Sequence, residues 1–91
     1  MPKAKINIIL FGKVQGVGFR QAALKYAQEH GITGWVANDE EGKLKINAEG
    51  NNLEIKKFVD WCKQGPEKAK VERCEAYYTK YKDEFTKFEI R

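Results

Sequence analysis

The residues best suited to chemistry lie at positions 12–20, where the sequence reads GKVQGVGFR. Three of these nine residues are glycines, which reach positive φ at little cost and let successive backbone N–H groups turn toward one point. Arg20 closes the segment with a planar fork of donors that matches phosphate or carboxylate oxygens. A helical pattern starts here, and the N–H groups of a helix N-terminus also attract anions. The segment predicts an anion-binding loop, and a glycine-rich turn with an exposed arginine is the simpler alternative.

Two common phosphate-binding motifs do not fit this segment. The Walker motif needs Gly-Lys-Ser/Thr after four intervening residues, and the dinucleotide fingerprint needs a third glycine where Gln21 stands. A chain of 91 residues is also short for a doubly wound nucleotide-binding domain. The loop is therefore not interpreted as a nucleotide site of either kind.

Length and composition restrict the class of protein. We expect residues 1–91 to form one domain whose core needs neither metal nor disulfide. A net charge of +4 favours an anionic ligand or nucleic acid without deciding between them. Cys62 and Cys74 are too few for a zinc site, so we expect reduced thiols, with a disulfide as the alternative. The apolar run before Gly12 is too short for a signal peptide or membrane span, which favours a cytoplasmic protein that binds no membrane.

Hydrophobic periodicity predicts the order of the elements. Strands are expected at 6–11, 33–38, 43–49, 71–81 and 85–90, and helices at 20–30 and between Asn51 and Gly65. The order strand, helix, strand, strand, helix, strand is typical of a split βαβ arrangement. We therefore predict an α+β fold, a ferredoxin-like βαββαβ sandwich in which two helices cover one face of an antiparallel sheet.

Two other features could carry chemistry, but each has a simpler structural explanation. His30 is the only histidine, and it falls in the last turn of the first predicted helix, where a cation favours the helix dipole. The acidic run at 39–41 could hold a hard cation, but it lies in the turn of a predicted hairpin. We expect solvated turn residues there and no metal.

With these motifs in place, the chain resembles the acylphosphatases over essentially its full length. The segment at 12–20 matches the anion-loop signature of that family at its fixed positions. A second motif, GWVAN at 34–38, is followed by Gly42 and Gly50 at the spacing that the family shows. Leu44 stands where valine is usual, which is a conservative change on a buried strand. Gly65 and Pro66 also follow the pattern of the family after its second helix.

The resemblance implies a ferredoxin-like fold and hydrolysis of an acyl phosphate to a carboxylate and inorganic phosphate, with no cofactor or metal. It assigns phosphate binding to Arg20 and orientation of the attacking water to Asn38. It also implies that backbone groups of the loop bind the phosphate, namely those of Gln15, Gly16, Val17, Gly18 and Phe19.

Such a sparse site is chemically sufficient for this reaction. The leaving group is a carboxylate, whose conjugate acid has a pKa of roughly 4, so it departs without a proton donor. A largely dissociative phosphoryl transfer also needs little activation of the nucleophile, so positioning and charge stabilisation carry most of the catalysis. An amide orients water well but is a poor base, and we expect the proton to end on a phosphate oxygen of the substrate.

Two other functions share this predicted topology. RNA-recognition domains do so, but residues 43–49 place Lys, Asn and Glu where such domains carry stacking aromatics. The carbamoyl-phosphate-handling module of hydrogenase-maturation proteins is a third possibility, and the short isolated chain argues against it. We therefore expect a monomer whose partners are an acyl phosphate and inorganic phosphate, with no nucleic acid.

Overall fold

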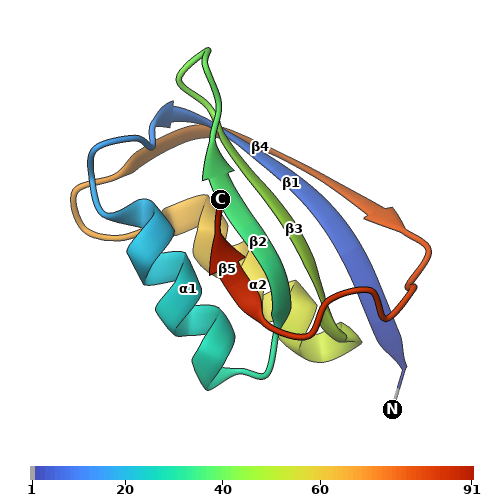
Figure 1. Ribbon diagram of the computed structural model, residues 1–91. Coiled ribbons are helices and arrows are strands. Elements are labelled where there is room, and N and C mark those ends of the chain that lie inside the picture. Colours follow the sequence, from blue (N-terminus) through green and yellow to red (C-terminus); the bar gives the residue numbers. More distant parts are fainter. Residues whose placement is uncertain (1) are drawn as a thin grey trace.

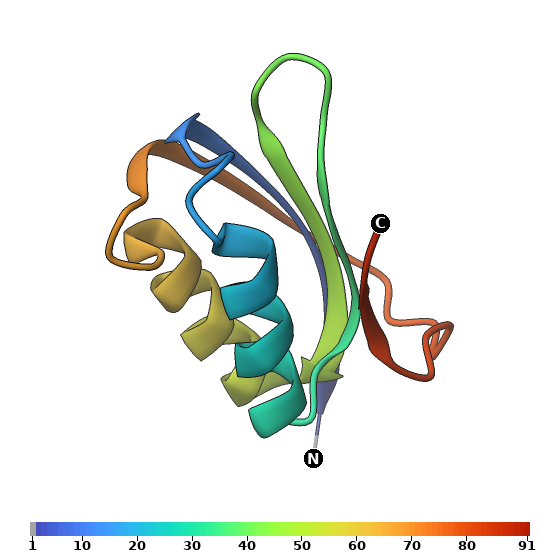
Figure 2. The same ribbon diagram turned by 60° about the vertical axis from the view of Figure 1, so that its left-hand side comes forward.

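The computed structural model describes residues 2–91, which form a five-stranded sheet with two helices packed on one face (Figures 1 and 2). In chain order the elements are β1 (Lys3–Lys13), α1 (Phe19–Glu29), β2 (Thr33–Asn38), β3 (Leu44–Asn51), α2 (Asn52–Gln64), β4 (Lys70–Thr79) and β5 (Phe88–Ile90). The predicted elements are all present, and their boundaries differ from the predicted ones by a few residues.

The strand order is β4-β1-β3-β2-β5, which confirms the ferredoxin-like α+β fold. β1 pairs antiparallel with β3 and β4, and β2 pairs antiparallel with β3. β5 instead runs parallel to β2, with Gly34 opposite Phe88, so the sheet is mixed and not wholly antiparallel. β5 runs parallel to β2 because of the path of the connection at 80–87. This connection leaves β4 at one edge of the sheet, crosses one end of the sheet and enters the opposite edge in the same direction as β2 (Figure 1).

The core lies between the sheet and the two helices, where the predicted apolar faces meet. The buried side chains of the two central strands alternate along each strand, as a period of two requires. They are Ile6, Ile8, Leu10, Leu44, Ile46 and Ala48. The helices contribute Ala23, Ala27, Ile55, Phe58, Val59 and Cys62 at helical spacing. Their burial confirms the apolar stripes that the sequence predicts.

The helix ends show how local chemistry sets the boundaries. Asn51 is the N-cap of α2, and its side chain accepts the N–H of Leu53 at 2.9 Å. The carboxylate of Glu54, three residues after this cap, lies 3.0 Å from Nδ1 of His30. His30 occupies the C-cap of α1, where we predicted it, and so links the end of one helix to the start of the other.

Both cysteines are free thiols, as predicted. Burial raises the pKa of Cys62 well above its usual range and also raises the pKa of Cys74. A raised pKa lowers the fraction of reactive thiolate, so both behave as packing residues. Within residues 2–91, no helix is long and apolar enough to cross a membrane.

Candidate active site

A cavity of about 150 Å³ lies where the loop after β1 and the carboxyl end of β2 come together. Figure 1 shows both segments at the same end of the molecule, with the C-terminus close to β2. The cavity is lined by Val14, Gly16, Gly18, Phe19, Arg20, Gln21, Asn38 and Ile90. The two predicted catalytic side chains, 18 positions apart in the sequence (38 − 20 = 18), therefore line one cavity.

Two residues of the loop backbone are left-handed, as residues of anion-binding nests are. Gly16 and Gly18 have φ of +71° and +77°, a region that side chains disfavour. A Cβ at either position would meet no atom within 4 Å, so conformation and not lack of space accounts for glycine here. Left-handed residues within a turn let neighbouring N–H groups converge on an anion.

The N–H groups of this region are also free of backbone partners. The first N–H of α1 with a backbone acceptor is that of Ala22, which donates to Gly18 at 3.1 Å. In the described part of the chain, no backbone acceptor takes the N–H groups of residues 15–21. Gly18 is the N-cap and supplies no side-chain acceptor, so these groups are available to an external anion.

Apolar side chains of the loop pack into the core and hold the loop in place. Val14 and Val17 are buried, and Phe19 packs edge-to-face against Trp61 with 5.5 Å between ring centroids. The loop therefore turns its apolar side chains into the core, while Gly16 and Gly18 lie exposed at its surface. This division accounts for the alternation of glycine and apolar residues in the motif.

Arg20 lies in the first turn of α1, exposed and beside the cavity. Among residues 2–91 no carboxylate forms an ion pair with it, and the first turn of α1 contains no acidic residue. Its guanidinium is thus free to bind a phosphate or carboxylate through two parallel hydrogen bonds.

Asn38 is the last residue of β2, and its side chain ends in the cavity wall. Its Oδ1 is buried and has no hydrogen-bond partner within residues 2–91. A buried acceptor without a partner costs about 1–3 kcal/mol, so a turn of the side chain that brings this oxygen to a hydrogen-bond donor in the cavity is favourable. Water is such a donor.

The hairpin after Asn38 is rigidified by Asp39. Its Oδ1 accepts the N–H groups of Glu41 and Lys43, each at 2.9 Å, and its own N–H donates to the carbonyl of Lys43 at 3.0 Å. Partial burial alone would raise the pKa of Asp39, but the two N–H donors and the charges of Lys43 and Lys45 together hold it below its usual value. The carboxylate is therefore committed to shaping the turn.

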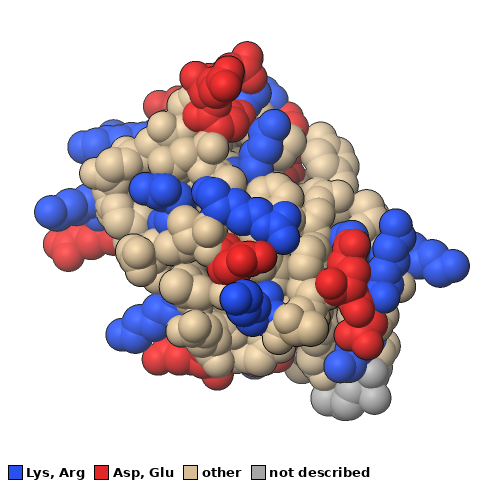
Figure 3. All heavy atoms as spheres, in the orientation of Figure 1, with Lys and Arg blue, Asp and Glu red and all other residues tan. Residues whose placement is uncertain are grey.

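The charged side chains are distributed unevenly around this face. Figure 3 shows Lys and Arg side chains across the middle of the face that carries the C-terminus, and acidic side chains at the upper tip. That tip is the β2–β3 turn with Asp39, Glu40 and Glu41, which we predicted to be a turn. The Lys and Arg side chains on this face attract an anionic ligand, whereas the acidic turn next to Asn38 repels it.

The structure separates the predicted loop residues into distinct groups. Gly16, Gly18 and Phe19 line the cavity with Arg20, whereas Val17 is buried in the core. The side chain of Gln15 does not line the cavity; its Nε2 donates to two carbonyl groups of the β2–β3 hairpin.

Sequence reasoning missed three residues of the cavity wall, namely Val14, Gln21 and Ile90. Val14 lies within the motif at 12–20 and Gln21 directly follows it, so the turn itself brings both to the cavity. Ile90 reaches the cavity through the parallel pairing of β5 with β2, for which the sequence has no local signal.

The fold and this cavity together define a small α+β protein whose cavity lies at a helix N-terminus beside an arginine without an ion-pair partner in residues 2–91. Residues 6–90 match the Acylphosphatase family, and the chain belongs to that family of hydrolases. It is 39% identical to the acylphosphatase of Roseiflexus sp. (strain RS-1), over 99% of this chain and 97% of that one.

Solved structures agree with this membership. The acylphosphatase from Bacillus subtilis superposes with a TM-score of 0.92 at 32% identity, covering 97% of this chain and 98% of that chain. Full-length HypF, solved in a phosphate- and nucleotide-bound form, contains a similar unit with a TM-score of 0.89 at 30% identity. The match covers 99% of this chain and 12% of HypF.

Proposed function

We propose that residues 1–91 act as one acylphosphatase domain, which hydrolyses an acyl phosphate to a carboxylate and inorganic phosphate without a metal. The observation that carries this proposal is one cavity lined by loop glycines, by Asn38 and by an arginine that has no ion-pair partner in residues 2–91. The buried Oδ1 of Asn38 has no hydrogen-bond partner in those residues either. Membership of the acylphosphatase family supports the reaction class.

Arg20 and the backbone N–H groups of residues 15–19 hold the phosphoryl oxygens. The N–H groups have no competing acceptor in the backbone of residues 2–91, and the buried side chains of Val14, Val17 and Phe19 hold the loop before the substrate arrives. Preorganised donors stabilise the charge that redistributes over the phosphoryl group in the transition state.

Asn38 orients the attacking water through its Oδ1. An amide oxygen accepts a hydrogen bond from the water, while the neighbouring loop holds the phosphorus in line. The amide does not take the proton, which passes to a phosphoryl oxygen of the substrate. The carboxylate leaves as an anion and needs no acid.

The test is hydrolysis of benzoyl phosphate in the presence of EDTA by the wild type, Arg20→Gln and Asn38→Ala. Each substitution should lower turnover on the order of 10³-fold, by analogy with arginines that stabilise phosphoryl transfer. Lys25→Gln is the matched control, because it removes one exposed positive charge from α1 away from the cavity. It should hydrolyse the substrate at the wild-type rate.

Three outcomes would contradict the proposal. Wild-type turnover in folded Arg20→Gln or Asn38→Ala would remove the roles assigned to these residues. Loss of wild-type activity in EDTA would show a metal-dependent reaction. Complete inactivity of folded wild type would leave an anion-binding protein, and a salt-sensitive gel shift would then test nucleic acid as its ligand.

A further inference from the structure

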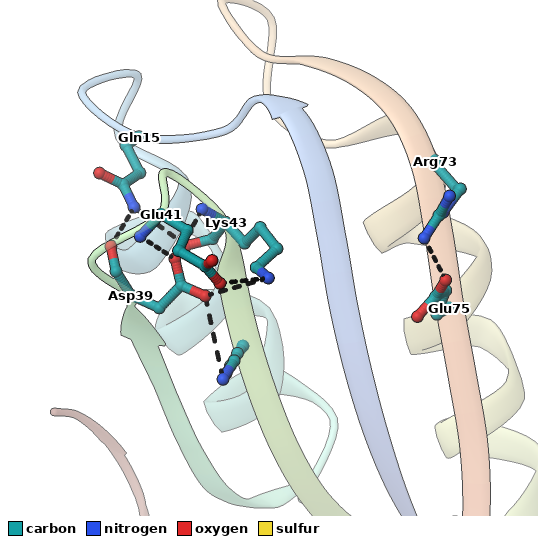
Figure 4. A network of polar contacts seen from close by, with 7 residues as sticks. Gln15, Asp39, Glu41, Lys43, Arg73 and Glu75 are labelled. Carbon is teal, nitrogen blue, oxygen red and sulfur yellow. Dashed lines mark hydrogen bonds and ion pairs between the residues drawn. The ribbon is translucent and has the colours of Figure 1, made fainter.

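The side chain of Gln15 bridges the two segments that carry the candidate catalytic groups. Its Nε2 donates to the backbone carbonyls of Asp39 and Lys43, each at 2.9 Å (Figure 4). Both hydrogens of the amide are therefore used within the protein. Gln15 lies directly before Gly16 of the loop, and Asp39 lies directly after Asn38.

The far end of this bridge is a rigid turn. The Lys43 carbonyl that accepts from Gln15 also accepts the N–H of Asp39 at 3.0 Å. The Asp39 carboxylate in turn accepts N–H groups of Glu41 and Lys43 at 2.9 Å. A turn bonded at this many points moves as a unit, and Asn38 is covalently joined to it.

The near end is equally constrained. Val14 and Val17 on either side of Gln15 are buried in the core, so the loop cannot shift without disturbing the packing. The amide of Gln15 thus joins two rigid bodies, one that holds the anion-binding N–H groups and one that holds Asn38.

We propose that Gln15 is a positioning residue that sets the separation between the anion-binding loop and Asn38. This proposal rests on the proposed function, because that separation matters only when a water on Asn38 attacks a phosphoryl group on the loop. Rates of such reactions are sensitive to geometry, and a displacement of about 1 Å can cost on the order of 10²-fold.

The proposal predicts that loss of the Gln15 bridge lowers turnover and leaves phosphate binding nearly unchanged. Arg20 and the loop N–H groups bind phosphate on the near side of the bridge, and Asn38 lies on the far side. Gln15→Met removes both donors at similar side-chain size, so it should lower kcat for benzoyl phosphate on the order of 10²-fold. The inhibition constant for inorganic phosphate should stay within about threefold of the wild-type value, because a displaced Asn38 leaves the phosphate-binding groups of the loop in place.

Gln28→Met is the matched control, since Gln28 is an exposed residue of α1 that does not line the cavity. It should match the wild type in both constants. A Gln15→Met variant with wild-type kcat would overturn the proposal. A phosphate inhibition constant that rises as much as kcat falls would also overturn it, because Gln15 would then shape the loop itself.

Gln15→Glu provides a test that general destabilisation does not mimic. An ionised carboxylate would face two carbonyl oxygens, whereas a protonated one regains a single donor. The ratio of kcat in Gln15→Glu to kcat in wild type should rise as pH falls toward about 4.3, the ordinary pKa of Glu. The charged groups of this network are Asp39, Glu41, Lys43 and Lys45, and all four are present in both proteins. A flat ratio would contradict the bridge.

One measurement needs no variant and therefore does not depend on folding of a mutant. The side-chain NH₂ of Gln15 in the wild type should exchange with solvent more slowly than that of Gln28, as followed by NMR. Equal exchange rates would refute the bridge even if the enzyme is active. An inactive wild type would refute the proposed function instead, so the two failures are distinguishable.

Discussion

Glu49 offers a quantitative test of how this fold is held together. Its side chain is 1% exposed, and its carboxylate accepts the N–H groups of Lys82, Asp83 and Glu84 at 2.9, 3.1 and 2.9 Å. These three residues belong to the connection that carries the chain from β4 across the sheet to β5. Glu49→Ala removes both acceptor oxygens and the negative charge opposite Lys5 in the β1–β3 register, while Lys5 keeps its ion pair with Glu84.

The expected loss follows from these three bonds. A hydrogen bond to a charged group contributes about 1.5–3 kcal/mol, but the donors lie in exposed residues where water can replace the carboxylate. The three losses are therefore less than additive, and we expect a total of about 3 kcal/mol. For a domain of this size, each kcal/mol shifts Tm by about 4–8 °C, so Tm should fall by roughly 12–24 °C.

Urea unfolding followed by circular dichroism measures this loss, and a thermal scan gives Tm. Glu49→Gln keeps one oxygen acceptor and should fall between the alanine variant and the wild type. Glu72→Ala removes an exposed carboxylate from β4 and should stay within about 0.5 kcal/mol of the wild type. A Glu49→Ala protein within 1 kcal/mol of the wild type would refute the reasoning.

Two further predictions concern the backbone and acid pH. Gly34→Ala should unfold the protein or lower its urea midpoint far more than Gly18→Ala does. The new Cβ at position 34 would lie 1.9 Å from the carbonyl oxygen of Asn47, whereas a Cβ at position 18 meets no atom within 4 Å and adds only backbone strain of about 1–2 kcal/mol. Equal urea midpoints of the two variants would contradict this. The lowered pKa of Asp39 adds stability that is present above its unfolded-state pKa of about 3.9 and is lost as pH falls through its lower folded pKa. The advantage of the wild type over Asp39→Asn in free energy of unfolding should therefore shrink below about pH 4, and a difference that persists to about pH 2 would contradict the argument.

Local periodicity was sufficient to predict the layers of this fold. Ile6, Ile8 and Leu10 alternate because a strand has a period of two, and Phe58 and Val59 recur at helical spacing, so both patterns identify buried faces. The glycine loop and Asn38 were likewise identified from their motifs, and both line the same cavity.

Features that depend on distant pairing were not predictable from such patterns. The acceptors of Gln15 are backbone carbonyls 24 and 28 positions away, and any residue type supplies a carbonyl. Lys5 and Glu49 are buried although charged residues normally indicate solvent, because the connection at 80–87 covers them. The parallel direction of β5 depends on the path of that same connection.

The strand order β4-β1-β3-β2-β5 also governs when the cavity can exist during folding. β1 pairs with β4 near the other end of the chain, with Lys5 opposite Thr79, and such distant contacts close late because chain entropy opposes them. The cavity needs the loop after β1, the end of β2 and Ile90 of β5, which come together only when β1, β3, β2 and β5 have paired. An anion in the cavity binds the folded state and not the unfolded state, so it shifts the folding equilibrium toward the folded state by mass action.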